Sequence, residues 1–193
     1  MKRINSIKNQ ISQSIDLKKL ILNDKNILTL LSKVSDQCLN AIKSNKKIIL
    51  AGNGGSAADA QHIAAEFVSK FNMDRKSIPA LALTTDTSIL TSISNDYDFS
   101  KIFARQIESL GNEGDIFIGI STSGNSENII QALKEGKKRG IINVGLTGKN
   151  GGKMKDLCDF CICVPSLDTP RIQESHLMIE HILCGIIEEE LFG

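Results

Sequence analysis

The chain has 193 residues, of which 41% are hydrophobic and 23% charged, and its formal net charge is +1. This length allows one domain with a sizeable core. The near-zero charge and the scarcity of aromatic residues disfavour a nucleic-acid-binding protein. No stretch approaches the roughly 18 apolar residues of a membrane span, and the N-terminus lacks the apolar segment of a signal peptide. We therefore expect a cytoplasmic protein that binds neither nucleic acid nor membrane.

Two amphipathic helices are predicted at the start of the chain, over about residues 4–22 and 26–45. In the second helix the apolar residues follow helical spacing. They are Ile27, Leu30, Leu31, Val34, Cys38, Leu39 and Ile42. Because both helices precede the first strand, we expect this N-terminal extension, about residues 4–45, to pack on the domain or to form an oligomer contact.

Strands and helices then alternate along the chain. Strands are predicted over 46–52, 79–85, 114–122, 141–148 and 160–165, and helices over 57–71, about 98–110, 127–140 and about 170–190. This alternation predicts an α/β fold, with a doubly wound five-stranded parallel sheet covered by helices on both faces. No linker, low-complexity tract or internal repeat interrupts the pattern, so residues 1–193 are expected to form a single domain.

Five cysteines lie at positions 38, 158, 161, 163 and 184. An odd number without a secretion signal indicates reduced thiols. The run CDFCIC invites a zinc interpretation, but it belongs to an apolar strand-like segment. Most zinc sites also need a second pair of ligands, and this chain has no second cysteine pair. We therefore expect Cys161 and Cys163 to be small hydrophobic residues on one strand face.

Small polar residues follow the predicted strands, at the edge where open parallel sheets bind ligands. These loops are GNGGSAADA (52–60), TTDTS (84–88) with SNDYD (94–98), STSGNSEN (121–128) and TGKNGG (147–152). STSGNSEN precedes a helix, so its backbone N–H groups and hydroxyls favour an anion such as phosphate. Helix capping is the alternative explanation, although one cap needs only one residue.

The common nucleotide-binding loops are not supported. GxxxxGK[ST] does not occur, and GNGGSA fits GxGxxG poorly because Ala57 takes the place of the last glycine.

Histidines occur only at positions 62, 176 and 181. His62 and Glu66 are four residues apart and share one helix face, as do Gln173 and His181 over eight residues. An ordinary structural role is the simpler interpretation of any lone histidine. The neighbours of Glu66 are apolar, however, which disfavours an idle surface charge there.

Several motifs, taken in their order along the chain, resemble one protein family, and this resemblance suggests a specific role for these residues. GNGGSAADAQHIAAEF, TTDTS, SNDYDFSKIFARQIESLG, GDIFIGISTSGNSENIIQAL, LTGKNGGKM and DTPRIQESHLMIEHIL resemble the phosphoheptose (sedoheptulose 7-phosphate) isomerases of the SIS superfamily. The resemblance covers about residues 25–190.

The resemblance implies a metal site, a substrate site and an assembly. One zinc ion per subunit would be bound by His62, Glu66, Gln173 and His181. Substrate contacts would come from Asn53, Gly54, Gly55, Ser56, Glu66, Asn95, Asp96, Ser121, Thr122, Ser123, Ser126 and Gln173. The family forms homotetramers with active sites shared between subunits. Helices 57–71 and 170–190 would then meet from different chains.

The resemblance also implies the reaction. Sedoheptulose 7-phosphate would be converted to D-glycero-D-manno-heptose 7-phosphate through an enediol, with Glu66 as the base and His181 in the second proton transfer. This is the first step of ADP- or GDP-heptose synthesis for bacterial surface glycans such as lipopolysaccharide.

Three alternatives stay open. A related non-catalytic class that binds the replication initiator lacks the glutamate and the final histidine, which this chain has. A sugar-phosphate sensor would normally be joined to a DNA-binding module, and none is evident. The enzyme could also act on another sugar or form a product of another stereochemistry. Thr169 and Pro170 lie in a segment that varies among members of the resembling family, and this segment could affect the choice of substrate.

Overall fold

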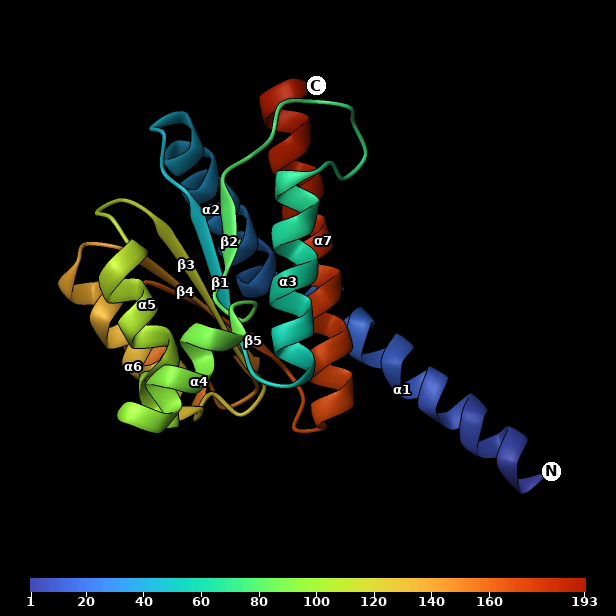
Figure 1. Ribbon diagram of the computed structural model, residues 1–193. Helices are drawn as coiled ribbons and strands as arrows, with labels where there is room; N and C mark the ends of the chain where they lie inside the picture. The colour runs from blue at the N-terminus through green and yellow to red at the C-terminus, as the bar shows by residue number, and fades with distance from the viewer.

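The computed structural model describes all 193 residues and contains one parallel β-sheet flanked by helices (Figure 1). The strands are β1 (Ile48–Ala51), β2 (Ala80–Ala82), β3 (Ile116–Ser121), β4 (Ile142–Gly148) and β5 (Phe160–Val164), in the order β2-β1-β3-β4-β5. The α-helices are α1 (Lys2–Asn23), α2 (Lys25–Lys43), α3 (Gly55–Val68), α4 (Thr87–Asp96), α5 (Ile102–Leu110), α6 (Glu127–Lys138) and α7 (Thr169–Phe192). Two short 3₁₀ helices are η1 (Phe99–Lys101) and η2 (Gly152–Leu157). The predicted five-stranded parallel sheet is confirmed.

Helices cover both faces of the sheet. Alternate side chains of β1 enter different cores, because successive residues of a strand point to opposite faces. Ile48 and Leu50 pack with α2, α3 and α7, whereas Ile49 and Ala51 pack with α5 and α6. The expected doubly wound arrangement is therefore observed, and it explains why the central strands are apolar throughout.

Local sequence signals fix where several helices begin. Asp24 lies before α2 and accepts hydrogen bonds from the backbone N–H groups of Asn26 and Ile27, as a helix N-cap does. Pro170 lies in the first turn of α7, a position that needs no N–H donor. This placement gives the Thr169 and Pro170 segment a structural role at the start of the helix.

Helix α4 differs from the sequence prediction, which placed only a polar connection before residue 98. Asp86 caps this helix by accepting a hydrogen bond from Ile89 N at 2.9 Å. None of the residues of α4 is buried. Only Leu90 and Ile93 pack partly against the core, so the sequence shows too short an apolar period to reveal the helix.

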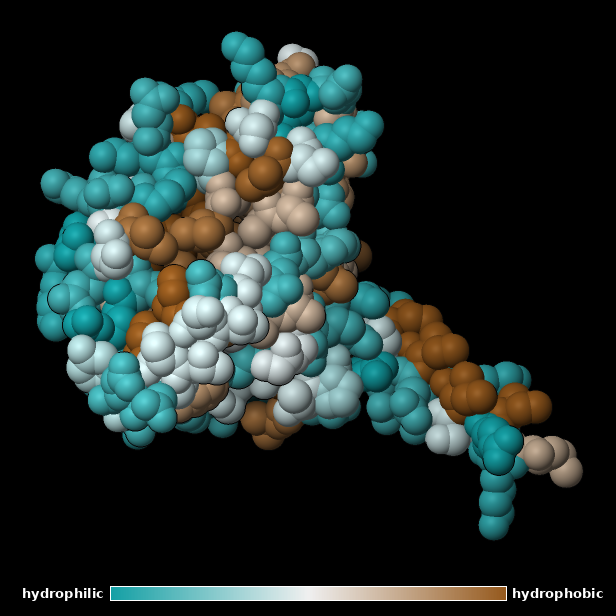
Figure 2. Space-filling model, viewed as in Figure 1, coloured by the Kyte–Doolittle hydropathy of each residue, from teal (hydrophilic) through white to brown (hydrophobic).

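Helix α1 projects away from the sheet, and its contacts with the rest of the chain come from Gln10 and the turns that follow it (Figure 1). Its buried residues are Leu17 and Ile21. Four isoleucines form a stripe along the projecting part, which we call the α1 stripe: Ile4, Ile7, Ile11 and Ile15, with exposed fractions of 59, 51, 55 and 48%. Figure 2 shows apolar colour along this helix.

Helix α1 is also joined to α7 by a hydrogen bond, in which Arg171 Nη1 donates to the carbonyl of Gln10 at 2.9 Å. None of the helices is both long and apolar enough to cross a membrane.

Candidate active site

Helices α3 and α7 lie side by side and bring His62, Glu66 and His181 together (Figure 1). The Nε2 atoms of the two histidines are 2.9 Å apart, and Glu66 Oε1 lies 3.4 Å from His62 Nε2. All three donor atoms lie within 4.8 Å of one another. Two imidazoles and one carboxylate are a nitrogen and oxygen donor set that suits Zn²⁺. We call these three residues the triad.

The triad corrects one expectation from the sequence. Helices 57–71 and 170–190 were expected to meet from different chains, yet His62, Glu66 and His181 converge within a single chain. The physical reason is that α3 and α7 are neighbours on the same face of the sheet and share its larger core.

Gln173 was assigned to the same metal site, and it lies nearer to the start of α3. A side chain at Gly55 would collide with its amide nitrogen, so the absence of a Cβ there makes room for Gln173. From Gly55 to His62 the rise along the helix is about 10 Å. Gln173 therefore lies between the glycine turn after β1 and the triad.

Two buried carboxylates lie beneath the triad, and neither was predicted from the sequence. Asp59 and Glu180 are almost fully buried, on α3 and α7 respectively. Burial raises the pKa of Glu180 to about 8, and the nearby Asp59 adds to the effect. Burial also raises the pKa of Asp59, although the Gln173 amide and His62 act in the opposite direction. The only sequence signal for them was an acidic residue on an otherwise apolar helix face.

The segment after α3 holds an aromatic ring against His181. The ring of Phe71 stacks on His181, with 5.6 Å between ring centroids. Glu188 of α7 fixes this segment by accepting hydrogen bonds from the backbone N–H groups of Phe71, Asn72 and Met73 and from Arg75 Nε. Glu188 is thus a positioning residue for the ring that packs on the triad.

Replacing Glu188 with Gln is expected to lower the free energy of unfolding by about 2–4 kcal/mol, because Arg75 would then lack its buried charged partner. Burial acts to raise the pKa of Glu188, but the hydrogen bonds and Arg75 outweigh it and lower that pKa. The stabilisation is therefore present at neutral pH and lost as the pH falls through the lowered pKa.

Urea unfolding at neutral and acid pH measures this difference. The matched control is Glu189→Gln, since Glu189 is exposed on the same helix and should change the stability by less than about 0.5 kcal/mol. Equal unfolding curves for the two variants at neutral pH would contradict the assigned role.

The third histidine has a structural environment. His176 is fully buried, and its Nε2 lies 3.1 Å from the carbonyl oxygen of Thr147 at the end of β4. Burial lowers the pKa of His176 to about 4, so this imidazole is neutral at physiological pH. It links α7 to the edge of the sheet where the polar loops lie.

The glycine turn after β1 is tied to the start of α6. Asn53 and Asn128 exchange two side-chain hydrogen bonds of 2.9 and 2.8 Å. Gly54 has a φ of +57°, a conformation that favours glycine. The predicted substrate residues Asn53, Gly54, Gly55 and Ser56 therefore form a connected turn at the carboxyl end of the sheet.

The serine-rich loop after β3 forms a cluster of hydroxyls, which we call the cradle: Ser121, Thr122, Ser123 and Ser126. Ser121 Oγ lies 2.9 Å from Ser126 Oγ and 3.4 Å from Ser123 Oγ. Ser126 is the N-cap residue of α6, but its side chain makes no capping hydrogen bond. Capping therefore does not account for its hydroxyl, and the helix N-terminus behind it favours an anion.

A small cavity adjoins the cradle. It has a volume of about 150 Å³ and is lined by Thr122, Ser123, Gly148, Lys149, Asn150, Ser166, Leu167, Thr169 and Ile172. Lys149 is the one charged residue among them. The cavity therefore offers a cation next to the predicted phosphate position.

Asn95 and Asp96 are not brought to the triad in a single chain. Both are exposed at the end of α4, where Asn95 Nδ2 donates to Asp96 Oδ1 at 2.8 Å. Apolar residues of α4 pack with the α5 and α6 face of the sheet, which is opposite to α3 and α7. The two predicted parts of the substrate site thus lie on different sides of the chain.

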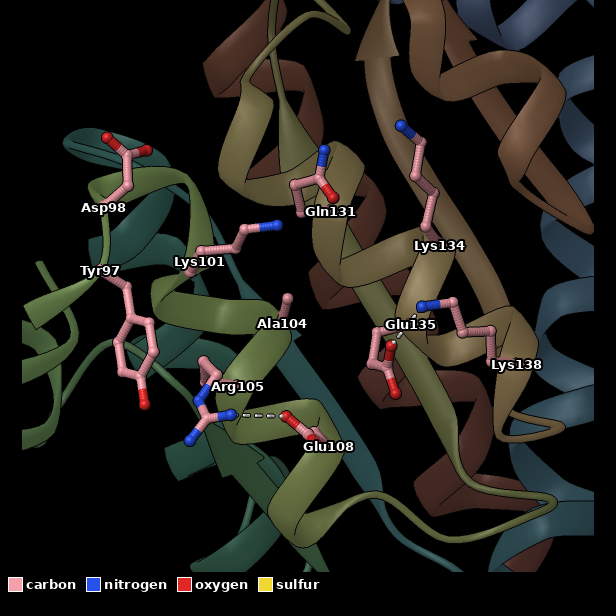
Figure 3. Close-up of a pocket in the computed structure, with 10 residues that line it drawn as sticks. All are labelled: Tyr97, Asp98, Lys101, Ala104, Arg105, Glu108, Gln131, Lys134, Glu135 and Lys138. Carbon is pink, nitrogen blue, oxygen red and sulfur yellow. Dashed lines mark hydrogen bonds and ion pairs between the residues drawn. The ribbon is translucent and has the colours of Figure 1, made fainter.

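A larger cavity is lined by none of the predicted site residues, although Tyr97 in its wall directly follows Asp96. It is a groove of about 510 Å³ between α5 and α6 (Figure 3). Much of its charge is neutralised locally, by the ion pairs Arg105 with Glu108 and Lys138 with Glu135 at 3.2 and 3.0 Å. The triad, in contrast, does not line this groove. It is partly exposed to solvent on the surface of α3 and α7, where the side chain of His62 is 47% exposed.

Comparison with known proteins defines the class first. Residues 17–148 match the sequence profile of the SIS domain. This stretch spans β1 to β4, the glycine turn and the cradle. The parallel sheet and the loops at its carboxyl edge are thus those of an SIS-domain protein.

Full-length relatives are more specific. The phosphoheptose isomerase of Aneurinibacillus thermoaerophilus is 59% identical over 186 residues, which are 96% of this chain and 94% of that protein. The structure of a phosphoheptose isomerase from Francisella tularensis superposes with a TM-score of 0.94 at 35% identity, covering 98% and 100% of the two chains. The structure of the phosphoheptose isomerase from Neisseria gonorrhoeae superposes with a TM-score of 0.90 at 39% identity, covering 96% of this chain and 98% of that one. The chain belongs to the phosphoheptose isomerase family, and it is an isomerase.

Proposed function

We propose that this enzyme interconverts sedoheptulose 7-phosphate and D-glycero-D-manno-heptose 7-phosphate, the first step towards a nucleotide-activated heptose for a bacterial surface glycan. The observation that carries the proposal is the convergence of Glu66, His62 and His181 on one surface, in a chain that also carries a hydroxyl cradle. The reaction needs a base beside carbon, a second proton-transfer group and an anchor for the phosphate. The chain has a candidate for each.

Glu66 is the proposed base and His181 the proposed second proton-transfer group. Glu66 Oε1 faces His62, which leaves the other carboxylate oxygen to remove a proton from C1 or C2. His181 has its Nε2 at the same centre and its ring fixed by Phe71. An imidazole held in this way can carry a proton to or from the neighbouring oxygen, so that the hydrogen moves between C1 and C2 through an enediol.

The triad is the proposed binding site for one Zn²⁺ per subunit, with Gln173 as the fourth ligand. Its nitrogen and oxygen donors fit this ion. A bound zinc ion would supply Lewis-acid polarisation of the substrate carbonyl or hydroxyl. Gln173 lies beside Gly55, near the start of the same pair of helices.

The cradle is proposed to bind the phosphate, and the length of the substrate supports this. A seven-carbon chain built of bonds of about 1.5 Å reaches roughly 8 Å from C1 to C7. The rise along α3 from the glycine turn to His62 is similar, at about 10 Å. A sugar with its phosphate at the sheet edge would therefore extend towards the triad, with Asn53, Gly54 and Gly55 along the way.

Ser126→Ala is expected to raise KM by about tenfold and to change kcat less, because one hydroxyl donor to the phosphate is lost while the triad is untouched. Steady-state kinetics measures both constants. Ser109→Ala is a matched control, since Ser109 is exposed near the end of α5 and is not part of the cradle. An unchanged KM in Ser126→Ala would remove this hydroxyl from the phosphate site.

A homotetramer with shared active sites is proposed from two features of the chain. The α1 stripe exposes four isoleucines that no other part of the chain covers. The predicted substrate residues Asn95 and Asp96 lie on the face opposite to the triad. A second copy that covers α1 could also bring its α4 to the triad of the first.

The double variant Ile7→Asp and Ile11→Asp is expected to dissociate the assembly, since two charges would have to be buried in an apolar contact. Light scattering after size exclusion measures the mass. The activity per chain should fall with the mass, because the shared site would be incomplete. The control is Ser12→Asp and Ser14→Asp on the same helix. A variant that stays tetrameric would contradict the proposed contact.

The central experiment is direct. The purified protein is incubated with sedoheptulose 7-phosphate, with and without a chelator, and the product is identified by NMR. An aldoheptose 7-phosphate that forms only without chelator supports the proposal. Binding of the sugar phosphate without any conversion would instead indicate a non-catalytic SIS protein, the alternative that the presence of Glu66 and His181 disfavours.

A further inference from the structure

Three of the five cysteines lie together at the edge of the sheet. Cys161 and Cys163 are on β5, and their sulfur atoms are 3.8 Å apart. The Cys158 thiol, just before the strand, is a hydrogen-bonding neighbour of Cys161. All three side chains are half-buried, and Cys161 and Cys163 share one strand face, as expected from the sequence. Cys161 is the middle member of the row.

The neighbouring strand leaves space for these sulfurs. Gly145 of β4 pairs with Cys161 in the sheet. A Cβ at Gly145 would lie 2.7 Å from Cys158 Sγ and 3.3 Å from Cys161 Sγ. Any other residue at this position would push the sulfurs apart, so the glycine permits the cluster.

The separation of the two β5 sulfurs matches metal chemistry. In a tetrahedral site with metal–sulfur bonds of about 2.3 Å, adjacent thiolates are about 3.8 Å apart. Cys161 and Cys163 already have this separation. The pair can therefore bind a metal ion without a movement of the backbone.

One positive charge lies near the cluster, although it does not outweigh the opposing effects on the thiols. Lys155 of η2 lies close enough to favour the charged form of both thiols. The neighbouring Cys158 thiol and burial nevertheless raise the pKa of Cys161 to about 12. A metal ion must then displace protons from these thiols, and its affinity should increase with pH.

We infer that Cys161 and Cys163 form a second metal site, for a thiophilic d¹⁰ cation such as Cd²⁺, Zn²⁺ or Cu⁺, with Cys158 as a third ligand after a side-chain rotation. Thiolates select such ions over harder ones. The site is separate from the triad, because Cys158 packs with the α5 and α6 face of the sheet and the triad lies on the opposite one. It does not depend on the proposed reaction.

Cd²⁺ is the probe, added to the full-length protein reduced with a phosphine. The measurement is the ultraviolet charge-transfer absorption of cadmium thiolates, which imidazole and carboxylate ligands do not give. Because the triad also offers ligands to Cd²⁺, the signal is expected to saturate by two equivalents and to have the amplitude of one thiolate-bound Cd²⁺ per chain. The same titration in folded His181→Ala should keep the signal, since His181 lies on the face of the sheet opposite to the cysteines.

Cys161→Ser and Cys163→Ala are expected to weaken Cd²⁺ binding at least about a hundredfold, and Cys158→Ser about tenfold. Cys38→Ala is the matched control, because Cys38 is a thiol buried in the other core and its loss should leave the signal unchanged. Circular dichroism shows which variants are folded. Absence of the absorption in the wild-type protein, or its persistence in folded Cys161→Ser and Cys163→Ala, would overturn the proposal.

Discussion

Glu66→Gln is expected to reduce turnover by at least about 10²–10⁴-fold, while the affinity for the sugar phosphate stays nearly unchanged. General-base catalysis contributes rate factors of this size, and an amide cannot accept the proton. Gln has nearly the same shape as Glu, so the contacts of α3 with α7 should persist. The phosphate would still bind at the cradle, whose residues come from another part of the chain.

Turnover is measured by NMR with sedoheptulose 7-phosphate, and binding by calorimetry on the same preparation. Glu190→Gln is the control, because Glu190 is exposed near the end of α7. Metal content should be measured in parallel, since Glu66 is also a proposed ligand. A Glu66→Gln enzyme with near-native turnover would show that another group is the base.

His181→Ala is expected to lower both the zinc content and the rate, the latter by at least about a hundredfold. The substitution removes a donor that lies 2.9 Å from His62 Nε2. It also removes the ring on which Phe71 stacks, so a check of the fold by circular dichroism is needed.

Elemental analysis after dialysis against a defined zinc concentration measures the first effect. His62→Ala is the useful comparison, because it removes another ligand without removing the proposed proton-transfer group. Both variants should lose zinc, and adding excess zinc should restore more activity to His62→Ala. Unchanged metal content in His181→Ala would exclude this residue as a ligand.

The sequence predicted the architecture because its signals were strong. Apolar strands alternate with amphipathic helices, and β3 and β4 end in Ser121 and Gly148, whereas Pro165 follows β5. The five strands and their parallel arrangement were predicted, but the strand order, including the pairing of β1 with β3, was not. Helix α4 was missed because none of its residues is fully buried and only Leu90 and Ile93 pack against the core, which are too few to establish a helical period.

Part of the site was also accessible from the sequence. The spacing of His62 and Glu66 placed both on one helix face, and the structure brings His181 to them. Spacing could not show that α3 and α7 are neighbours in one chain, because helix adjacency depends on the order of the strands. It could not reveal Asp59 and Glu180 either, since their burial results from the packing of those two helices.

The hydrogen bond between Arg171 and Gln10 has a further consequence. Arg171 precedes Gln173 by two residues on α7, and Gln10 lies beside Ile11 of the α1 stripe. A second copy that docks on α1 is therefore connected, through this hydrogen bond, to α7, the helix that carries the proposed zinc ligand Gln173. Dilution that separates the copies would then loosen the metal centre as well as the quaternary contact, so specific activity and metal retention should decline together at low enzyme concentration.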